Sequence, residues 1–127
     1  MPVTNISYKT DADVVKTEEP NRASRDEVVL ASGSGVVACG TVLGTVTTTG
    51  RKRPLTLGAT DGTQNATDII LQRADATSAD VPVVALSRGT AEVVLQALVW
   101  PAGITGTQRS AALAQLEAKL ITARNGV

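Results

Sequence analysis

Histidine is absent from the 127 residues, and Cys39 is the only cysteine. Without histidine the chain has no Ser-His or Cys-His catalytic pair and lacks the commonest metal ligand, and a single thiol cannot form a disulfide within the chain. The only aromatic residues are Tyr8 and Trp100. These absences argue against an enzyme and against a bound metal or other cofactor.

Charge and hydropathy exclude further classes of protein. The 12 basic residues balance the 12 acidic residues, and a chain with no net charge and two aromatic rings is a poor candidate for binding nucleic acid. No stretch approaches the roughly 20 apolar residues of a membrane span, and the N-terminus lacks the basic and then apolar pattern of a signal peptide. The composition therefore predicts a soluble intracellular protein whose partner is neither nucleic acid nor membrane.

Small side chains dominate what is present. Ala, Thr, Val and Gly supply 62 of the 127 residues, whereas Leu and Ile together supply 16. Burial stabilises by about 25 cal/mol per Å² of apolar surface, so the burial of a small side chain contributes little free energy. Ordering each residue costs about 1.5 kcal/mol in conformational entropy. One domain of this composition is marginal by itself, and the composition favours an oligomer.

The first 27 residues predict an extended N-terminal arm before a domain over residues 28–127. Residues 1–26 hold 9 of the 24 charged residues and contain neither Leu nor Gly, so we expect them to be disordered in isolation. Alternation around Ile6 and Tyr8 indicates a short strand. The apolar residues of this arm are the candidate contacts with a partner: Val3, Ile6, Tyr8, Val14 and Val15.

From Val28 onward the pattern is typical of a small α+β domain that is mostly β. Short strands are predicted within residues 36–48, 55–57, 69–71 and 81–86, and the last two are expected to be buried. Gly40 and Gly44 indicate bulges or close backbone approach, and Pro82 indicates the start of a strand or an edge strand. Residues 50–53 fit a hairpin turn, whereas residues 92–99 fit either a strand or one face of a helix.

The clearest element is one helix near the C-terminus. Thr105 and Gln108 have the spacing of a capping box. An apolar stripe with helical periodicity follows at Ala112, Leu113, Leu116 and Leu120. The pattern predicts a helix of about 18 residues that ends at Asn125 and Gly126.

Two motifs that resemble chemical sites favour structural roles. Residues 33–35, Gly-Ser-Gly, resemble the start of a phosphate loop, but no helix and no Lys-Ser/Thr pair follow, so we interpret them as a flexible joint between arm and domain. Cys39 has no histidine to activate it and is interpreted as a buried thiol within a strand.

The charged motifs of the domain favour solvated turns. The spacing of Asp61, Asp68, Asp75 and Asp80 matches neither a calcium loop nor a fixed acid and base pair. The triple cation at residues 51–53 fits a solvated turn, or alternatively a contact with an acidic protein surface. Trp100 offers the largest piece of apolar area, and with Leu98 and Pro101 it is the candidate anchor of the core or of an interface between copies of the chain.

The run Gly-Thr-Val-Leu-Gly-Thr-Val at residues 40–46 resembles the opening strand of the bacteriophage head decoration protein D family. Further similarities follow in the same order at residues 59–64, 71–77 and 88–89. The Leu-Val-Trp-Pro-Ala-Gly segment at residues 98–103 and the helix at residues 108–120 resemble the C-terminal part of that family. The similarity spans roughly residues 36–124.

This resemblance implies a β-rich domain that forms a homotrimer and carries no catalytic site or cofactor. It implies a partner, the major capsid protein, and binding at three-fold and quasi-three-fold positions on the outer surface of the expanded head. There the trimers stabilise the shell against the pressure of packaged DNA, and the N-terminal arm helps to hold the shell. The protein is then made in the host cytoplasm and resides in the virion.

Two other classes of function fit parts of the sequence. A trimeric β-rich receptor-binding or fibre module explains the composition equally well, although two aromatic residues are few for contacts with sugars. A small hydrolase that uses Asp61, Asp68 or Asp80 is the third hypothesis.

Overall fold

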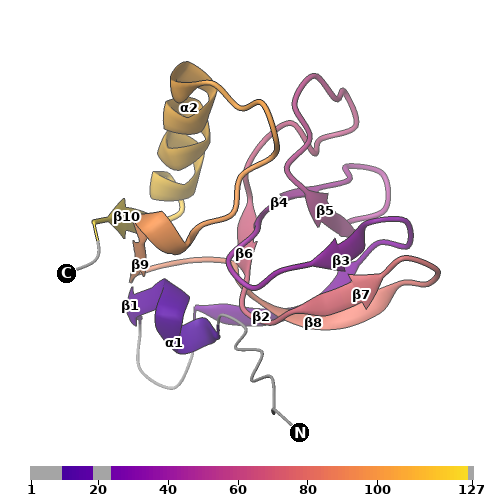
Figure 1. The fold of residues 1–127 in the computed structure, drawn as a ribbon, viewed down its shortest axis with the longest axis horizontal. Helices are drawn as coiled ribbons and strands as arrows, with labels where there is room; N and C mark the ends of the chain where they lie inside the picture. Colours follow the sequence, from indigo (N-terminus) through magenta and orange to yellow (C-terminus); the bar gives the residue numbers. More distant parts are fainter. Residues whose placement is uncertain (1–9, 19–23, 126–127) are drawn as a thin grey trace, which may run out of the picture.

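The computed structural model describes residues 10–18 and 24–125, and these residues are mostly β (Figure 1). The first half of the described chain comprises α1 (Asp11–Val14), β1 (Val15–Thr17), β2 (Arg25–Leu30), β3 (Gly35–Val37), β4 (Val42–Thr45) and β5 (Lys52–Pro54). The second half comprises β6 (Asp68–Ile70), β7 (Ala74–Ala76), β8 (Val81–Leu86), β9 (Ala91–Val94), the 3₁₀ turn η2 (Leu95–Ala97), α2 (Gly106–Glu117) and β10 (Ile121–Arg124).

A closed five-stranded barrel forms the larger part of the molecule. Its strands follow the order β2-β5-β4-β6-β8, and every pair is antiparallel except β2 with β5. The two-stranded β3–β7 ribbon packs Val37 and Ala76 into the same cluster as Leu30, Leu43 and Ile70 of the barrel. Closing the sheet pairs strands that would otherwise be edges, which suits a chain with few large side chains.

A second, three-stranded sheet lies beside the barrel and carries the C-terminal helix. Its order is β1-β9-β10, with β1 antiparallel and β10 parallel to β9. Buried side chains from this sheet, from α2 and from the barrel form one cluster, which includes Val14, Ile69, Val93, Leu116 and Ile121. Both sheets and the helix therefore share this core (Figure 1).

The mostly β fold class and most of the predicted strands are confirmed. A hairpin forms between β4 and β5, closed by a bond from the Val46 N–H to the Arg51 carbonyl. Its bounds differ from the prediction, because Lys52 and Arg53 of the predicted turn lie in β5 and the predicted strand over residues 55–57 is not formed. Pro82 lies at the start of β8, beyond the part of that strand that pairs with β6. The ambiguous residues 92–99 divide between β9 and η2.

Two interpretations of the first β-rich residues were wrong. Gly33 in the turn that joins β2 to β3 and Gly35 at the start of β3 both have positive φ, so they lie within the domain and do not join it to an arm. Cys39 is buried as predicted, but it lies in the turn after β3 and not in a strand. For Cys39, the neighbouring β-branched residues indicated a strand, but the periodicity did not locate where that strand ends.

The C-terminal helix begins as predicted and ends early. The Thr105 hydroxyl accepts a hydrogen bond from the Gln108 N–H, the Gln108 side-chain oxygen accepts one from the Thr105 N–H, and the capping box is confirmed. The helix is 12 residues long and ends at Glu117, not near Asn125. Leu120 has a φ of 65° and redirects the chain so that β10 pairs with β9. The helical spacing of the apolar residues does not indicate that β10 pairs with the distant strand β9.

Gly44 lies inside strand β4, where a close contact with another segment of backbone leaves no room for a side chain. A Cβ atom built on Gly44 lies 2.6 Å from the Cα of Thr63 and 2.7 Å from its carbonyl oxygen. The loop after Gly62 therefore crosses β4 at backbone contact distance, which confirms the predicted close approach. The backbone atoms of this loop cannot move away from an added Cβ atom as easily as the end of a flexible side chain could.

We expect Gly44→Ala to lower the free energy of unfolding by about 1–3 kcal/mol, because the added methyl overpacks a rigid site. Gly106→Ala is the matched control, since no atom lies within 4 Å of a Cβ at Gly106, and alanine favours helix. Urea unfolding of both variants measures the difference. Equal stability of the two variants would contradict this account of the β4 contact.

Candidate functional site

Residues 10–18 are folded against the domain, which differs from the predicted extended arm. Thr10 caps the short helix α1, and its N–H donates to Asp13. β1 then pairs with β9, with Val15 opposite Val93. Val14, the last residue of α1, is 0% exposed and belongs to the main core cluster. It therefore cannot contact a partner unless the domain opens.

Arg25 at the start of β2 holds this N-terminal segment through two carboxylates. Its guanidinium lies 2.7 Å from Asp11 and 2.6 Å from Glu18, and its Nε also donates to Glu18. Hydrogen bonds to Glu18 and Asp11 raise the pKa of Arg25 above its ordinary value. The guanidinium is mostly buried, where bidentate pairing is stronger than at an open surface.

The predicted contacts of the arm therefore divide into two groups. Val14 is fully buried, and Val15 is partly buried and packs against the core cluster. Val3, Ile6 and Tyr8 lie outside the described residues. The sequence indicated an arm around Val14 because charged residues surround it, but the partners of those charges stand in the domain.

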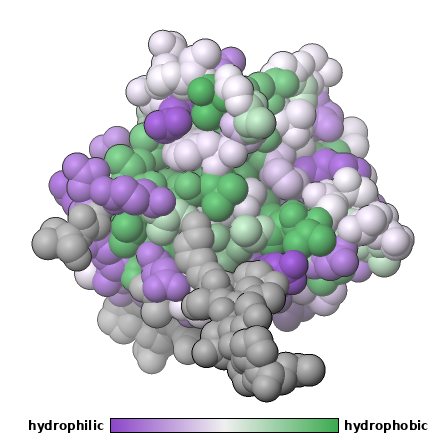
Figure 2. Space-filling model, viewed as in Figure 1, coloured by the Kyte–Doolittle hydropathy of each residue, from purple (hydrophilic) through white to green (hydrophobic). Residues whose placement is uncertain are grey.

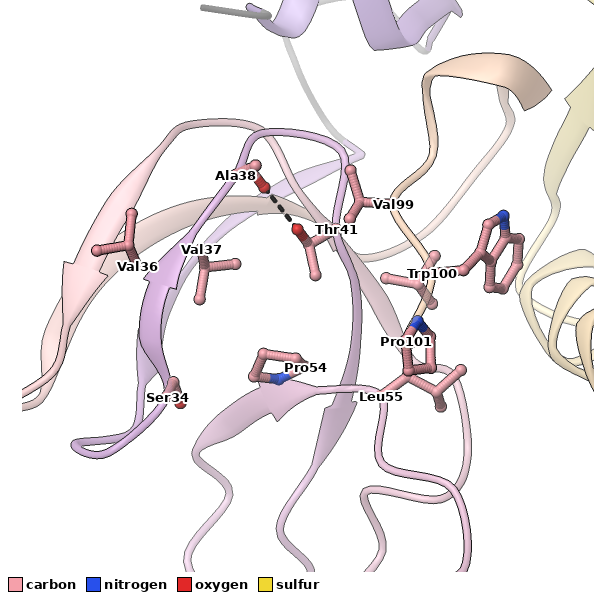
Figure 3. Close-up of a pocket in the computed structure, with 11 residues that line it drawn as sticks. Ser34, Val36, Val37, Ala38, Thr41, Pro54, Leu55, Val99, Trp100 and Pro101 are labelled. Carbon is pink, nitrogen blue, oxygen red and sulfur yellow. Dashed lines mark hydrogen bonds between the residues drawn. The ribbon is translucent and has the colours of Figure 1, made fainter. Parts of the chain in front are cut away.

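An apolar groove lies where β3, the start of β4 and β5 meet the segment after η2 (Figure 3). Its volume is about 250 Å³. Backbone bonds hold one wall, because the Val42 N–H donates to Val99 and the Val99 N–H donates to Gly40. The residues that line the groove are Ser34, Val36, Val37, Ala38, Thr41, Val42, Pro54, Leu55, Val99, Trp100 and Pro101.

Trp100 and Pro101 line this groove, whereas Leu98, two residues before Trp100, does not. Leu98 is buried in the main core cluster. Trp100 is partly buried, packs against the same cluster and has the guanidinium of Arg109 5.9 Å from its ring centre, within the range of a cation–π contact. The ring points toward α2 and away from the groove (Figure 3). Trp100 thus ties the groove wall to the helix.

Apolar side chains extend across the face that carries α2 and β3 (Figure 2). Val36 on β3 is 54% exposed at the groove. Such exposed apolar surface indicates a contact with another protein when it is continuous.

A second exposed surface lies on the outer side of β2 and β8, and we call it the outer patch. It consists of Glu27, Val29, Pro82 and Val84, with Val29 opposite Pro82 and Glu27 opposite Val84. Val29 is 40% and Val84 is 36% exposed. The sequence predicted a buried strand here, and this was wrong for alternate residues, because one face of β8 points outward.

Three of the candidate aspartates have local structural partners. Asp61 accepts bonds from the hydroxyl and N–H of Thr63, and Asp75 accepts the same pair from Thr77. These hydroxyl bonds lower the pKa of each carboxyl. Asp80 pairs with Arg51 at 2.9 Å. Within residues 10–18 and 24–125, no three Cys, Asp or Glu side chains gather as metal ligands.

Asp68 differs from the other aspartates because it is buried. It is 1% exposed on β6, lies 2.9 Å from Lys52 Nζ on β5 and accepts a hydrogen bond from Ser87. Lys52 also donates to Thr45 on β4. The triple cation is therefore not a solvated turn: Arg51 and Lys52 pair with aspartates, and Arg53 donates to the carbonyl of Ser32.

We expect Lys52→Met to lower the free energy of unfolding by about 3–5 kcal/mol, because it leaves the charge of Asp68 buried without a cation. Adding Asp68→Asn should recover part of this loss. Arg51→Met is the control, since its pair with Asp80 is about half exposed and is worth about 1 kcal/mol or less. Urea unfolding measures the free energy of unfolding of each variant. If Lys52→Met lowers it as little as Arg51→Met does, the proposed role of the buried pair is contradicted.

The described helices include none that is long and apolar enough to cross a membrane. In the comparison with protein families, the model of bacteriophage lambda head decoration protein D matches residues 4–121. The chain belongs to this head decoration family. The match covers most of the 127 residues and confirms the resemblance seen in the sequence.

The head decoration family is a structural family of the phage capsid and not a family of enzymes, so the protein has a capsid decoration role in the virion. The match begins at residue 4 and thus includes the N-terminal segment, which the resemblance over residues 36–124 had left out. No curated protein matches the chain.

Proposed function

We propose that this protein binds the expanded phage head as a homotrimer and stabilises the shell against the pressure of packaged DNA. The trimers occupy three-fold and quasi-three-fold positions on the outer surface, after synthesis in the host cytoplasm. The observation that carries this proposal is the family match over residues 4–121. The exposed apolar surfaces at the groove and on β2 and β8 support association with other subunits.

Avidity is the proposed mechanism of stabilisation. Each chain contributes a weak site, and three sites on one rigid trimer contact several copies of the major capsid protein at once. After the first contact the other two form at high effective concentration, so weak sites give tight overall binding. A trimer that spans neighbouring capsomers opposes their separation.

The proposed contact with the shell is the segment over residues 1–9. Val14 and Val15 pack in the domain, which leaves Val3, Ile6 and Tyr8 as the apolar side chains for a partner. An extended segment can add a strand to an exposed sheet edge of the shell protein, where main-chain bonds supply affinity and alternate side chains fill pockets. The family match favours this role over a receptor-binding or fibre module.

Deleting residues 1–9 should leave folding intact and weaken binding to expanded shells. A loss of about 1.4 kcal/mol for each arm is tenfold, and three independent contacts multiply to about a thousandfold. Co-sedimentation with expanded empty shells measures binding, and thermal unfolding measures stability. Undiminished binding of the deletion variant would contradict the proposed role of the arm.

Deleting residues 1–18 is the matched control for stability. This longer deletion removes β1 and the fully buried Val14, and loss of one buried valine costs about 1.5–3 kcal/mol. We therefore expect the longer deletion to unfold more easily than the shorter one. Equal stability of the two variants would contradict the assignment of residues 10–18 to the domain.

A further inference from the structure

We propose that Arg51 and Arg53 form a binding site for a carboxylate side chain of a partner protein. Both arginines line a pocket of about 280 Å³ at one end of the barrel. The partner segment that binds there presents an aspartate or a glutamate. This inference does not depend on the proposed contact of residues 1–9 with the shell, and it goes beyond the proposed function.

Three turns between strands form the walls of this pocket, on the side of the barrel that faces away from α2 (Figure 1). The turns comprise residues 31–34 between β2 and β3, residues 46–51 between β4 and β5, and residues 77–80 between β7 and β8. Backbone hydrogen bonds fix two of them, because the Ala31 N–H donates to the Lys52 carbonyl and the Val46 N–H donates to the Arg51 carbonyl. A site that is ordered before its ligand arrives loses less entropy on binding.

An internal carboxylate shows that the donors of this pocket can hold such a group. Asp80 accepts a hydrogen bond from the Ser32 N–H at 2.7 Å, and its other oxygen lies 2.9 Å from Arg51 Nε. A planar guanidinium matches the geometry of a carboxylate better than the ammonium of a lysine does. Backbone and side-chain donors are therefore already arranged around one carboxylate at the edge of the pocket.

Both guanidinium groups retain donors for a second carboxylate. A guanidinium has five N–H donors. Among residues 10–18 and 24–125, the Arg51 side chain pairs with Asp80 alone, and the Arg53 side chain donates to the Ser32 carbonyl alone, at 3.0 Å. About half of the Arg51 side chain is exposed, and Arg53 is partly buried. A carboxylate that enters the pocket therefore meets N–H groups with no other partner.

The charge of the pocket favours a carboxylate over a phosphate. Arg51 and Arg53 supply two positive charges and Asp80 supplies one negative charge, which leaves one positive charge on the lining residues. One carboxylate neutralises this charge, whereas a phosphate group brings up to two negative charges close to Asp80. Asp61 does not line the pocket and accepts its hydrogen bonds from Thr63. Nucleic acid binding relies on many cations, so an acidic protein segment is the partner that fits.

Titration of the isotope-labelled protein with a capped tripeptide that has a central glutamate tests this site. The NMR resonances of the Arg51 and Arg53 Nε–H groups should shift as the tripeptide binds. A tripeptide with a central glutamine is the matched ligand control, since it has a similar shape but no charge, and it should cause no shift. Inorganic phosphate should bind more weakly than the glutamate tripeptide, and tighter binding of phosphate would overturn the assignment to a carboxylate partner.

Substitutions in the pocket should change the affinity in opposite directions. Arg51→Gln and Arg53→Gln should each weaken binding of the glutamate tripeptide by about tenfold, because each removes a charged donor. Asp80→Asn should strengthen binding by about two- to fivefold, because it removes a like charge beside the bound carboxylate. The amide oxygen of an asparagine can still accept the hydrogen bond from the Ser32 N–H, so the turn is retained.

Arg124→Gln is the matched control variant, since the Arg124 side chain is 62% exposed and lies outside the pocket. It should leave binding unchanged. Thermal unfolding checks that each variant folds, and Arg53→Lys, which keeps the charge but loses the planar group, replaces Arg53→Gln if that variant unfolds.

Four results would each overturn the proposed site: no shift with the glutamate tripeptide, equal shifts with the glutamine tripeptide, unchanged binding by the Arg51 and Arg53 variants, or weaker binding by Asp80→Asn. A loss of binding by Arg124→Gln would also overturn it, because the attraction would then come from the overall charge. The titration uses no shells, so a failure here leaves the proposed function to be decided by co-sedimentation with expanded shells.

Discussion

The pairing of Arg25 with Asp11 and Glu18 determines where the domain begins. These ion pairs hold residues 10–18 beside β2, so that Val14 enters the core and β1 extends the sheet of β9 and β10. Without this pairing, each of the charged side chains would favour solvent. The segment proposed to reach the shell is thereby shortened to residues 1–9, and it starts from a fixed point on the domain.

Small side chains allow segments of backbone to approach each other closely in the barrel. Gly44 admits the loop at Thr63 to backbone distance, and the closed barrel surrounds a compact cluster of valine, leucine, isoleucine and alanine. Within the barrel wall, Lys52 and Asp68 connect β5 and β6 across β4.

The sequence predicted those structural features that depend on interactions between residues close together in the chain. The capping box at Thr105 and the strand start at Pro82 depend on neighbouring residues, and the structure confirms both. Features that depend on distant partners were missed. Nothing near Val14 indicates Arg25 as the partner of its neighbouring carboxylates, and nothing near Leu120 indicates that β10 pairs with β9. Composition alone suggested a charged arm where the chain folds back.

Images of expanded empty shells mixed with the purified protein test the central claim most directly. The account predicts added density on the outer surface at the three-fold and quasi-three-fold positions, with three copies of this domain in each. Shells without added density, or with density at other symmetry positions, would contradict it.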